Sequence, residues 1–319
     1  MFAPAPEWIM LGYETTFSSS PLKHFAYPFR AMGGPNELQI YARDATPANT
    51  IADIAIAEVE RIEAKYSRYR ADSMLSKINQ AAGIGATTVD TETAALLDYA
   101  AACYEQSGGL FDISSGGLRR VWNFSEGRVP AAEIILEVLA HVGWQKIAWH
   151  HPVLSLPAGM EIDFGGIGKE YAADRVASVC TEHGVQHGFV NLGGDIRVFG
   201  PHPDGTPWSI GIAHPRRDDR VLASIAIPRG AIATSGDYER YFEIDGKRYC
   251  HILNPLTGFP VQGLQAVTVI APLCTVAGSL CTIAMLKGDE GIEFLTEQEM
   301  PWMAVDGKGR VRGPLSEKN

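Results

Sequence analysis

The sequence predicts an α+β fold in which a mixed or antiparallel sheet is flanked by helices. Apolar residues recur at helical spacing over about 36–144, whereas short β-type runs dominate from about 145 to 319. Strands and helices do not alternate regularly, as they would in a parallel sheet built from βαβ units. Hydrophobic residues make up 46% of the 319 residues and charged residues 20%, which is ordinary for a soluble globular protein.

Residues 1–35 are rich in proline and serine and are expected to be irregular, ahead of one domain over 36–319. The helix-rich part, about 36–144, opens with the strand pattern "NELQIYA". Helical spacing and N-cap residues such as Ser73 then predict four helices. Their ranges are 48–66, a short helix from Asp72 or Ser73, 91–107 and 131–142.

The sheet-rich part, about 145–319, contains runs of β-type residues. The predicted strands are "KIAWH" (146–150), "MEIDF" (160–164), "GFVNLGGDIRVFG" (188–200), "WSIGIA" (208–213), "LASIAIP" (222–228), "YFEIDGKRYCHIL" (241–253) and "AVTVIAP" (266–272). Asp245–Gly246 predicts a hairpin turn inside one of them. Helices are predicted over 169–183, 275–287 and 289–298, and a closing hairpin over 303–313.

Composition argues against several classes of function. The net charge of −10, with no basic stripe to offset it, argues against a nucleic-acid-binding protein. No window approaches the roughly 18 apolar residues of a membrane span. Five cysteines without a CxxC pair indicate reduced, mostly buried thiols. The N-terminus lacks a basic signal region and a lipoprotein cysteine, so a cytoplasmic location is expected.

The segment "CHILNPLTGFPV" (250–261) compresses many polar and turn-forming residues after a predicted strand. Zinc binding by Cys250 together with His251 is disfavoured, because neighbouring side chains on a strand point to opposite faces. A cysteine nucleophile is also disfavoured, because no specific turn motif surrounds Cys274, and a buried thiol is the simpler interpretation. "MEIDFGGIGK" predicts either an anion-binding strand–loop–helix junction or only a tight turn. It is not a Walker A motif, since Asp163 stands where the first glycine is required.

Six segments occur in an order that resembles the ApbE family of FAD:protein FMN transferases. They are "YSRYRADSMLSKIN" (66–79), "GGLFDISSGGLRRVWNF" (108–124), "IDFGGIGKEYAADRVA" (162–177), "FVNLGGDIRVFG" (189–200), "IATSGDYERYFEIDGKRYCHILNPLTGFPV" (232–261) and "VTVIAPLCTVAGSLCTIAMLKG" (267–288). "AMGG" (31–34) is similar to the family's N-terminal methionine–glycine motif.

The resemblance implies an ApbE-like fold with an FAD cleft between subdomains, and a transferase that cleaves FAD. FMN would pass to a threonine or serine of an acceptor protein through a phosphoester, AMP would leave, and Mg²⁺ would neutralise phosphoryl charge. His251 would accept the proton of the incoming hydroxyl. The residues implied to contact FAD are Met32, Tyr69, Leu110, Phe111, Asp112, Asp163, Lys169, Ile252, Leu253 and Thr257. The metal positions would be Gly166 through its carbonyl, position 278 and Thr282.

Two residues depart from the family pattern, which has aspartate at positions 254 and 278. Asn254 and Gly278 stand there in this chain. Loss of a carboxylate is expected to weaken Mg²⁺ binding, with Asp195 or Asp237 as possible replacements, and restoring it by Gly278→Asp is expected to raise activity. Two alternatives to transfer remain: an FAD pyrophosphatase, or an FAD-binding protein that has lost catalysis.

Overall fold

The computed structural model describes residues 21–316 of the 319. Its centre is an eight-stranded antiparallel sheet. In spatial order the strands are β1 (Lys23–Ala31), β2 (Gly34–Ala42), β6 (Gly188–Leu192), β7 (Asp195–Gly200), β10 (Gly230–Gly236), β13 (Leu264–Ala271), β14 (Trp302–Asp306) and β15 (Val311–Arg312). The prediction of an α+β fold with a large antiparallel sheet is confirmed.

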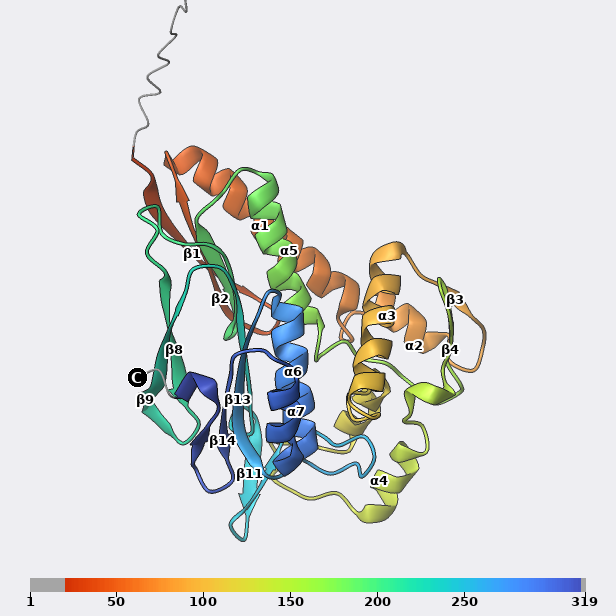
Figure 1. The fold of residues 1–319 in the computed structure, drawn as a ribbon. Helices are drawn as coiled ribbons and strands as arrows, with labels where there is room; N and C mark the ends of the chain where they lie inside the picture. The colour runs from red at the N-terminus through yellow and green to blue at the C-terminus, as the bar shows by residue number, and fades with distance from the viewer. Residues whose placement is uncertain (1–20, 317–319) are drawn as a thin grey trace, which may run out of the picture.

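Helices cover one face of this sheet (Figure 1). The α-helices are α1 (Ala45–Tyr66), α2 (Met74–Gln80), α3 (Thr91–Gln106), α4 (Ala132–Leu139), α5 (Gly168–Glu182), α6 (Cys274–Lys287) and α7 (Gly291–Glu297). α6 lies centrally, packed on β10, β13, α5 and α7. Its apolar residues surround the helix, as expected for an element buried on all sides.

Smaller elements surround this core. The opposite sheet face is covered by the hairpin of β8 (Trp208–His214) and β9 (Arg217–Ile227), through an apolar cluster that includes Trp208, Ile196 and Ile232. The remaining elements are β3 (Thr87–Thr88), β4 (Ala148–His150), β5 (Val153–Ser155), β11 (Tyr241–Ile244), β12 (Lys247–Cys250) and the 3₁₀ segments η1 (Ile113–Arg120), η2 (Trp144–Lys146), η3 (Gly288–Glu290) and η4 (Pro314–Ser316).

The expectation of an irregular segment over 1–35 is wrong for the part that the structure describes, and residues 1–20 lie outside it. Residues 23–31 form β1, whose alternating Phe25, Tyr27 and Phe29 pack against the core. Pro28 is tolerated because β1 is an edge strand, where a missing N–H breaks no ladder. β2 pairs with β6, so the helix-rich and sheet-rich parts of the chain share one sheet.

"MEIDF" (160–164) is not a strand, which corrects the prediction for that segment. The amide side chain of Asn79 takes the place of a neighbouring strand. It accepts from the Ile162 N–H at 2.8 Å and donates to the Ile162 carbonyl at 3.0 Å. The Asp163 N–H donates to the Ile113 carbonyl. The β-type pattern therefore reflects a buried extended segment whose polar groups are satisfied from α2 and η1.

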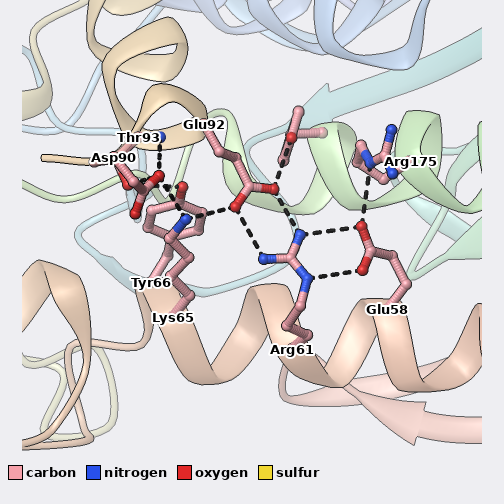
Figure 2. A network of polar contacts seen from close by, with 9 residues as sticks. Glu58, Arg61, Lys65, Tyr66, Asp90, Glu92, Thr93 and Arg175 are labelled. Carbon is pink, nitrogen blue, oxygen red and sulfur yellow. Dashed lines mark hydrogen bonds and ion pairs between the residues drawn. The ribbon is translucent and has the colours of Figure 1, made fainter.

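A network of ion pairs joins α1, α3 and α5 (Figure 2). Its centre is Glu92, in the first turn of α3, which accepts from Arg61 at 2.6 Å, from Lys65 at 2.6 Å and from the Tyr171 hydroxyl at 2.8 Å. Glu58 joins Arg61 to Arg175. The hydrogen bond from Arg61, aided by those from Lys65 and Tyr171, lowers the pKa of Glu92 to about 2.

Replacing Glu92 with Gln is expected to lower the free energy of unfolding at pH 7 by about 1 kcal/mol, since solvent screens this partly exposed network. The folded-state pKa is depressed, so the stabilisation is present above about pH 4.5 and is lost as the pH falls toward 2. Urea unfolding at pH 7, 4 and 3 should show that the difference in free energy of unfolding between Glu92→Gln and the wild type becomes smaller as the pH falls. Glu105→Gln, on the exposed side of α3, is the control and should change neither the free energy of unfolding nor its pH dependence.

Candidate functional site

Two tight turns lie together at one end of the large sheet. Met32–Gly33 joins β1 to β2, and Gly193–Gly194 joins β6 to β7. Asn36 pairs with Leu192, which brings both turns to the same sheet end. Met32 has φ 54° and Gly33 φ 78°, as a type I′ turn requires, although this conformation costs a non-glycine residue about 1 kcal/mol.

Lys169, in the first turn of α5, reaches the same sheet end. Its Nζ lies 2.6 Å from Asp195 Oδ2, at the start of β7, and next to Gly193. Burial alone would lower the pKa of Lys169, but the Asp195 and Glu170 carboxylates outweigh it and the pKa is raised. The α5 N-terminus and a charged ammonium therefore face the glycine turn, an arrangement that favours an anion.

A groove of about 430 Å³ opens between the α1–α2 connection, α2, η1 and the 161–163 segment, which leads into the glycine loop before α5. Asp163 Oδ2 lies in it, 3.0 Å from Arg68 and 3.3 Å from Arg119. Tyr69 is 82% exposed at the groove, and the Arg68 guanidinium lies 5.0 Å from the centre of its ring. The groove thus combines three arginines, including Arg120, with an exposed aromatic ring.

His251 lies just after β12, close enough to Arg119 and Arg240 for their charges to affect its pKa. Burial, followed by the positive charges of Arg119 and Arg240, lowers the pKa of His251 to about 4. Its Nδ1 is buried without a hydrogen-bond partner among the residues that the structure describes. The imidazole is therefore neutral at pH 7, and a neutral ring nitrogen is able to accept a proton.

The segment after His251 is a hydrogen-bonded turn. Asn254 Oδ1 accepts from the N–H groups of Leu256 and Thr257, and Thr257 Oγ1 accepts from the Phe259 N–H. Asn254 therefore has a local role in closing this turn. An amide oxygen closes this turn as a carboxylate oxygen would.

Gly258 holds this turn against α4. It has φ +71°, its carbonyl accepts from Trp122 Nε1 at 2.7 Å, and a Cβ at this position would collide with Ile135. Gly258→Ala is expected to lower the free energy of unfolding by about 2–4 kcal/mol, measured by urea denaturation. Gly205→Ala is the matched control, with φ +84° and open space around its Cβ, and should cost only about 1 kcal/mol. Equal losses would show that the contact with Ile135 is unimportant.

Several residues that the family resemblance implied for FAD contact lie beneath the site and shape it. Asp112 is buried, and its carboxylate accepts from Ser114 N, Ser114 Oγ and Trp144 N. Phe111 is buried against Gly166. The other apolar residues of this group, all packed in clusters, are Leu110, Ile252 and Leu253.

The cysteines of this region are buried thiols. Burial raises the pKa of Cys250 to about 11, and burial raises the pKa of Cys274 well above its usual value. Thiolates are the reactive form of cysteine, so neither residue is poised as a nucleophile at pH 7. This agrees with the prediction of buried thiols.

The expected metal positions Gly278 and Thr282 lie one turn apart on α6, and Thr282 Oγ1 is 3.4 Å from Ser235 Oγ. No group of three or more His, Cys, Asp or Glu side chains suited to a metal occurs within 21–316. Asp237 is held by two bonds of 2.6 Å from Arg216, and Asp195 is paired with Lys169. Both carboxylates are therefore engaged by a cationic side chain.

Four charged residues of the site were not singled out from the sequence. Arg68, Arg119 and Arg240 surround Asp163 and His251, and Glu170 lies against Gly278. Arg68 and Arg119 occur inside the segments "YSRYR" and "GGLRRVW", and Arg240 occurs inside "GDYERYF". Neighbouring aromatic residues were the available indication in each segment. Their convergence depends on segments that are far apart in the chain.

The fold and this cluster of cations define a protein built to bind a phosphate-containing ligand at the end of an antiparallel sheet. The sequence model of the ApbE family matches residues 32–305. The chain therefore belongs to the ApbE family. Its relatives include the FAD:protein FMN transferases of Vibrio cholerae, 34% identical over 77% of this chain and 76% of that protein, and of Treponema pallidum, 29% identical over 88% and 84%.

Solved structures agree with this assignment. The ApbE protein of Thermotoga maritima matches with a TM-score of 0.85 and 33% identity, over 93% of this chain and 98% of that one. The flavin transferase ApbE of Vibrio cholerae matches with a TM-score of 0.83 and 28% identity, over 93% and 99%. Within residues 21–316, no helix combines the length and apolar character needed to span a bilayer.

Proposed function

We propose that this chain is an FAD:protein FMN transferase. FAD would be cleaved between its two phosphates, FMN would be attached through a phosphoester to a threonine or serine of an acceptor protein, and AMP would be released. The observation that carries the proposal is the gathering of Lys169, Arg119 and Arg240 around a neutral His251. Arg68 is joined to Arg119 through their shared partner Asp163. Both parts suit attack of a hydroxyl on a pyrophosphate.

Each group has a role in this reaction. The exposed ring of Tyr69 offers a stacking surface for an aromatic ring of FAD, and the arginines and Lys169 offer donors to phosphate oxygens. The acceptor hydroxyl oxygen would form the new bond to the FMN phosphorus as His251 takes its proton. The bond to the bridging oxygen would break, and AMP would leave with that oxygen.

A divalent cation, Mg²⁺ by analogy with the family, fits the residues present. Glu170 Oε2 is a buried carboxylate oxygen without a partner among the described residues, and the Glu170 side chain lies against Gly278, an α6 position that the family pattern assigns to the metal. Thr282, the Gly166 carbonyl and this carboxylate are the residues that would hold the ion. The ion would supply neutralisation of charge on the transferred phosphoryl group.

Purified protein incubated with FAD, Mg²⁺ and a candidate acceptor tests the proposal. AMP release together with an acceptor mass raised by one FMN supports transfer. AMP without an adduct supports the FAD pyrophosphatase, in which water takes the place of the hydroxyl. Bound FAD with neither product would leave an FAD-binding protein without catalysis, and would contradict both enzymatic proposals.

A further inference from the structure

Glu170 is a buried carboxylate at the start of α5. It follows Lys169 in the first turn of α5, and only 7% of the residue is exposed. Its Oε2 has no hydrogen-bond partner within the described residues. Burial, followed by the negative charge of Asp195, raises the pKa of Glu170 against the opposing charge of Lys169.

The Glu170 side chain occupies the space above Gly278. A Cβ built on Gly278 would lie 2.6 Å from Glu170 Cγ and 2.8 Å from Glu170 Oε1. The missing side chain of α6 is therefore replaced in space by a carboxylate from α5, although the two residues are far apart in the sequence. Thr282, one turn along α6 from Gly278, lies on the same helix face.

Three other acidic side chains near this point are already committed to cationic or N–H partners. Asp195 is paired with Lys169, and Asp237 is held by Arg216. Asp174, one turn after Glu170 on α5, accepts from the Cys274 and Thr275 N–H groups and so caps α6. Glu170 is the carboxylate in this group that keeps a free oxygen.

We propose that Glu170 is the carboxylate ligand of the divalent cation in this chain, in place of the aspartate that the family pattern has at position 278. This inference rests on the proposed metal-dependent function and concerns one of its ligands. A purely structural residue here would be better served by an uncharged side chain of similar size, because the neighbouring Lys169 is already paired with Asp195 and burial disfavours a further carboxylate.

Because Glu170 occupies this space, Gly278→Asp alone is not expected to raise activity, contrary to the expectation from the sequence. The new Cβ would fall within 3 Å of Glu170, and the second carboxylate would add like-charge repulsion in a buried place. Gly278→Asp alone should therefore lower the melting temperature and impair cation binding. Combining it with Glu170→Gly clears the space and returns the carboxylate to α6, so the double variant should bind the cation again.

Titration of the full chain with Mn²⁺, followed by the electron paramagnetic resonance signal of the free ion, tests the proposal with and without FAD. Glu170→Gln is expected to weaken Mn²⁺ binding at least about tenfold. Mn²⁺ should raise the melting temperature of the wild type but not of this variant. Without metal, Glu170→Gln should melt at the same temperature as the wild type or higher. Glu182→Gln, exposed at the end of α5, is the matched control.

Unchanged Mn²⁺ affinity in Glu170→Gln would overturn the proposal, as would a wild-type chain that binds no Mn²⁺ in either condition. Failure of the double variant to bind Mn²⁺ while remaining folded would also count against it. Failure of the transferase proposal would be detected independently of Mn²⁺ binding, because AMP release and acceptor mass measure the reaction itself. An active wild type whose Glu170→Gln variant binds Mn²⁺ normally would contradict only the role of Glu170.

Discussion

Replacement of His251 by Asn is expected to lower kcat/KM for FMN transfer about 10²–10⁴-fold, the usual contribution of a general base. The fold should persist, because the imidazole Nδ1 has no partner among the described residues and the backbone N–H still bonds the Arg240 carbonyl. His150→Asn, on exposed β4, is the matched control and should transfer FMN normally. Wild-type rates in His251→Asn would remove this residue from the reaction.

The pH dependence of kcat/KM separates a catalytic from a structural role for His251. The neutral imidazole is the proton acceptor, so activity should fall as the pH falls through its pKa of about 4 and not near 6.5. Arg119→Gln removes a positive charge that lowers this pKa, so its acid limb should move to higher pH. An acid limb near pH 6.5 in the wild type would contradict the environment derived for His251.

Replacement of Lys169 by Met is expected to lower the free energy of unfolding at pH 7 by about 3 kcal/mol, because it leaves Asp195 buried without its cation. The same change should weaken FAD binding about 10- to 100-fold, since a charged donor to phosphate is lost. Urea unfolding measures the first effect, and quenching of flavin fluorescence on binding measures the second.

The double variant Lys169→Met with Asp195→Asn distinguishes the two effects. Neutralising Asp195 removes the unpaired buried charge, so much of the stability should return while FAD affinity stays low. Recovery of FAD affinity in the double variant would show that Lys169 acts on the ligand only through Asp195. Unchanged FAD affinity in Lys169→Met alone would exclude a contact between this lysine and phosphate.

Local sequence patterns predicted most elements of the fold because their causes lie within a few residues. Ser73 accepts from the Ser76 N–H at the start of α2, as its N-cap role requires. Asp245–Gly246 forms the hairpin between β11 and β12. The prediction failed at 160–164, where the partner of the extended backbone is the Asn79 side chain, which no local pattern reveals.

The sequence by itself determined the membership of the family and the positions of His251 and Lys169, since ordered motifs are local properties of the chain. Only the tertiary structure decided which charges meet. It brings Arg119 and Arg240 toward His251, commits Asp237 to Arg216, and places Glu170 in the space that Gly278 leaves empty. Burial and ion pairing depend on distances between segments remote in sequence, so the loss of one carboxylate and its replacement from another helix become visible only after folding.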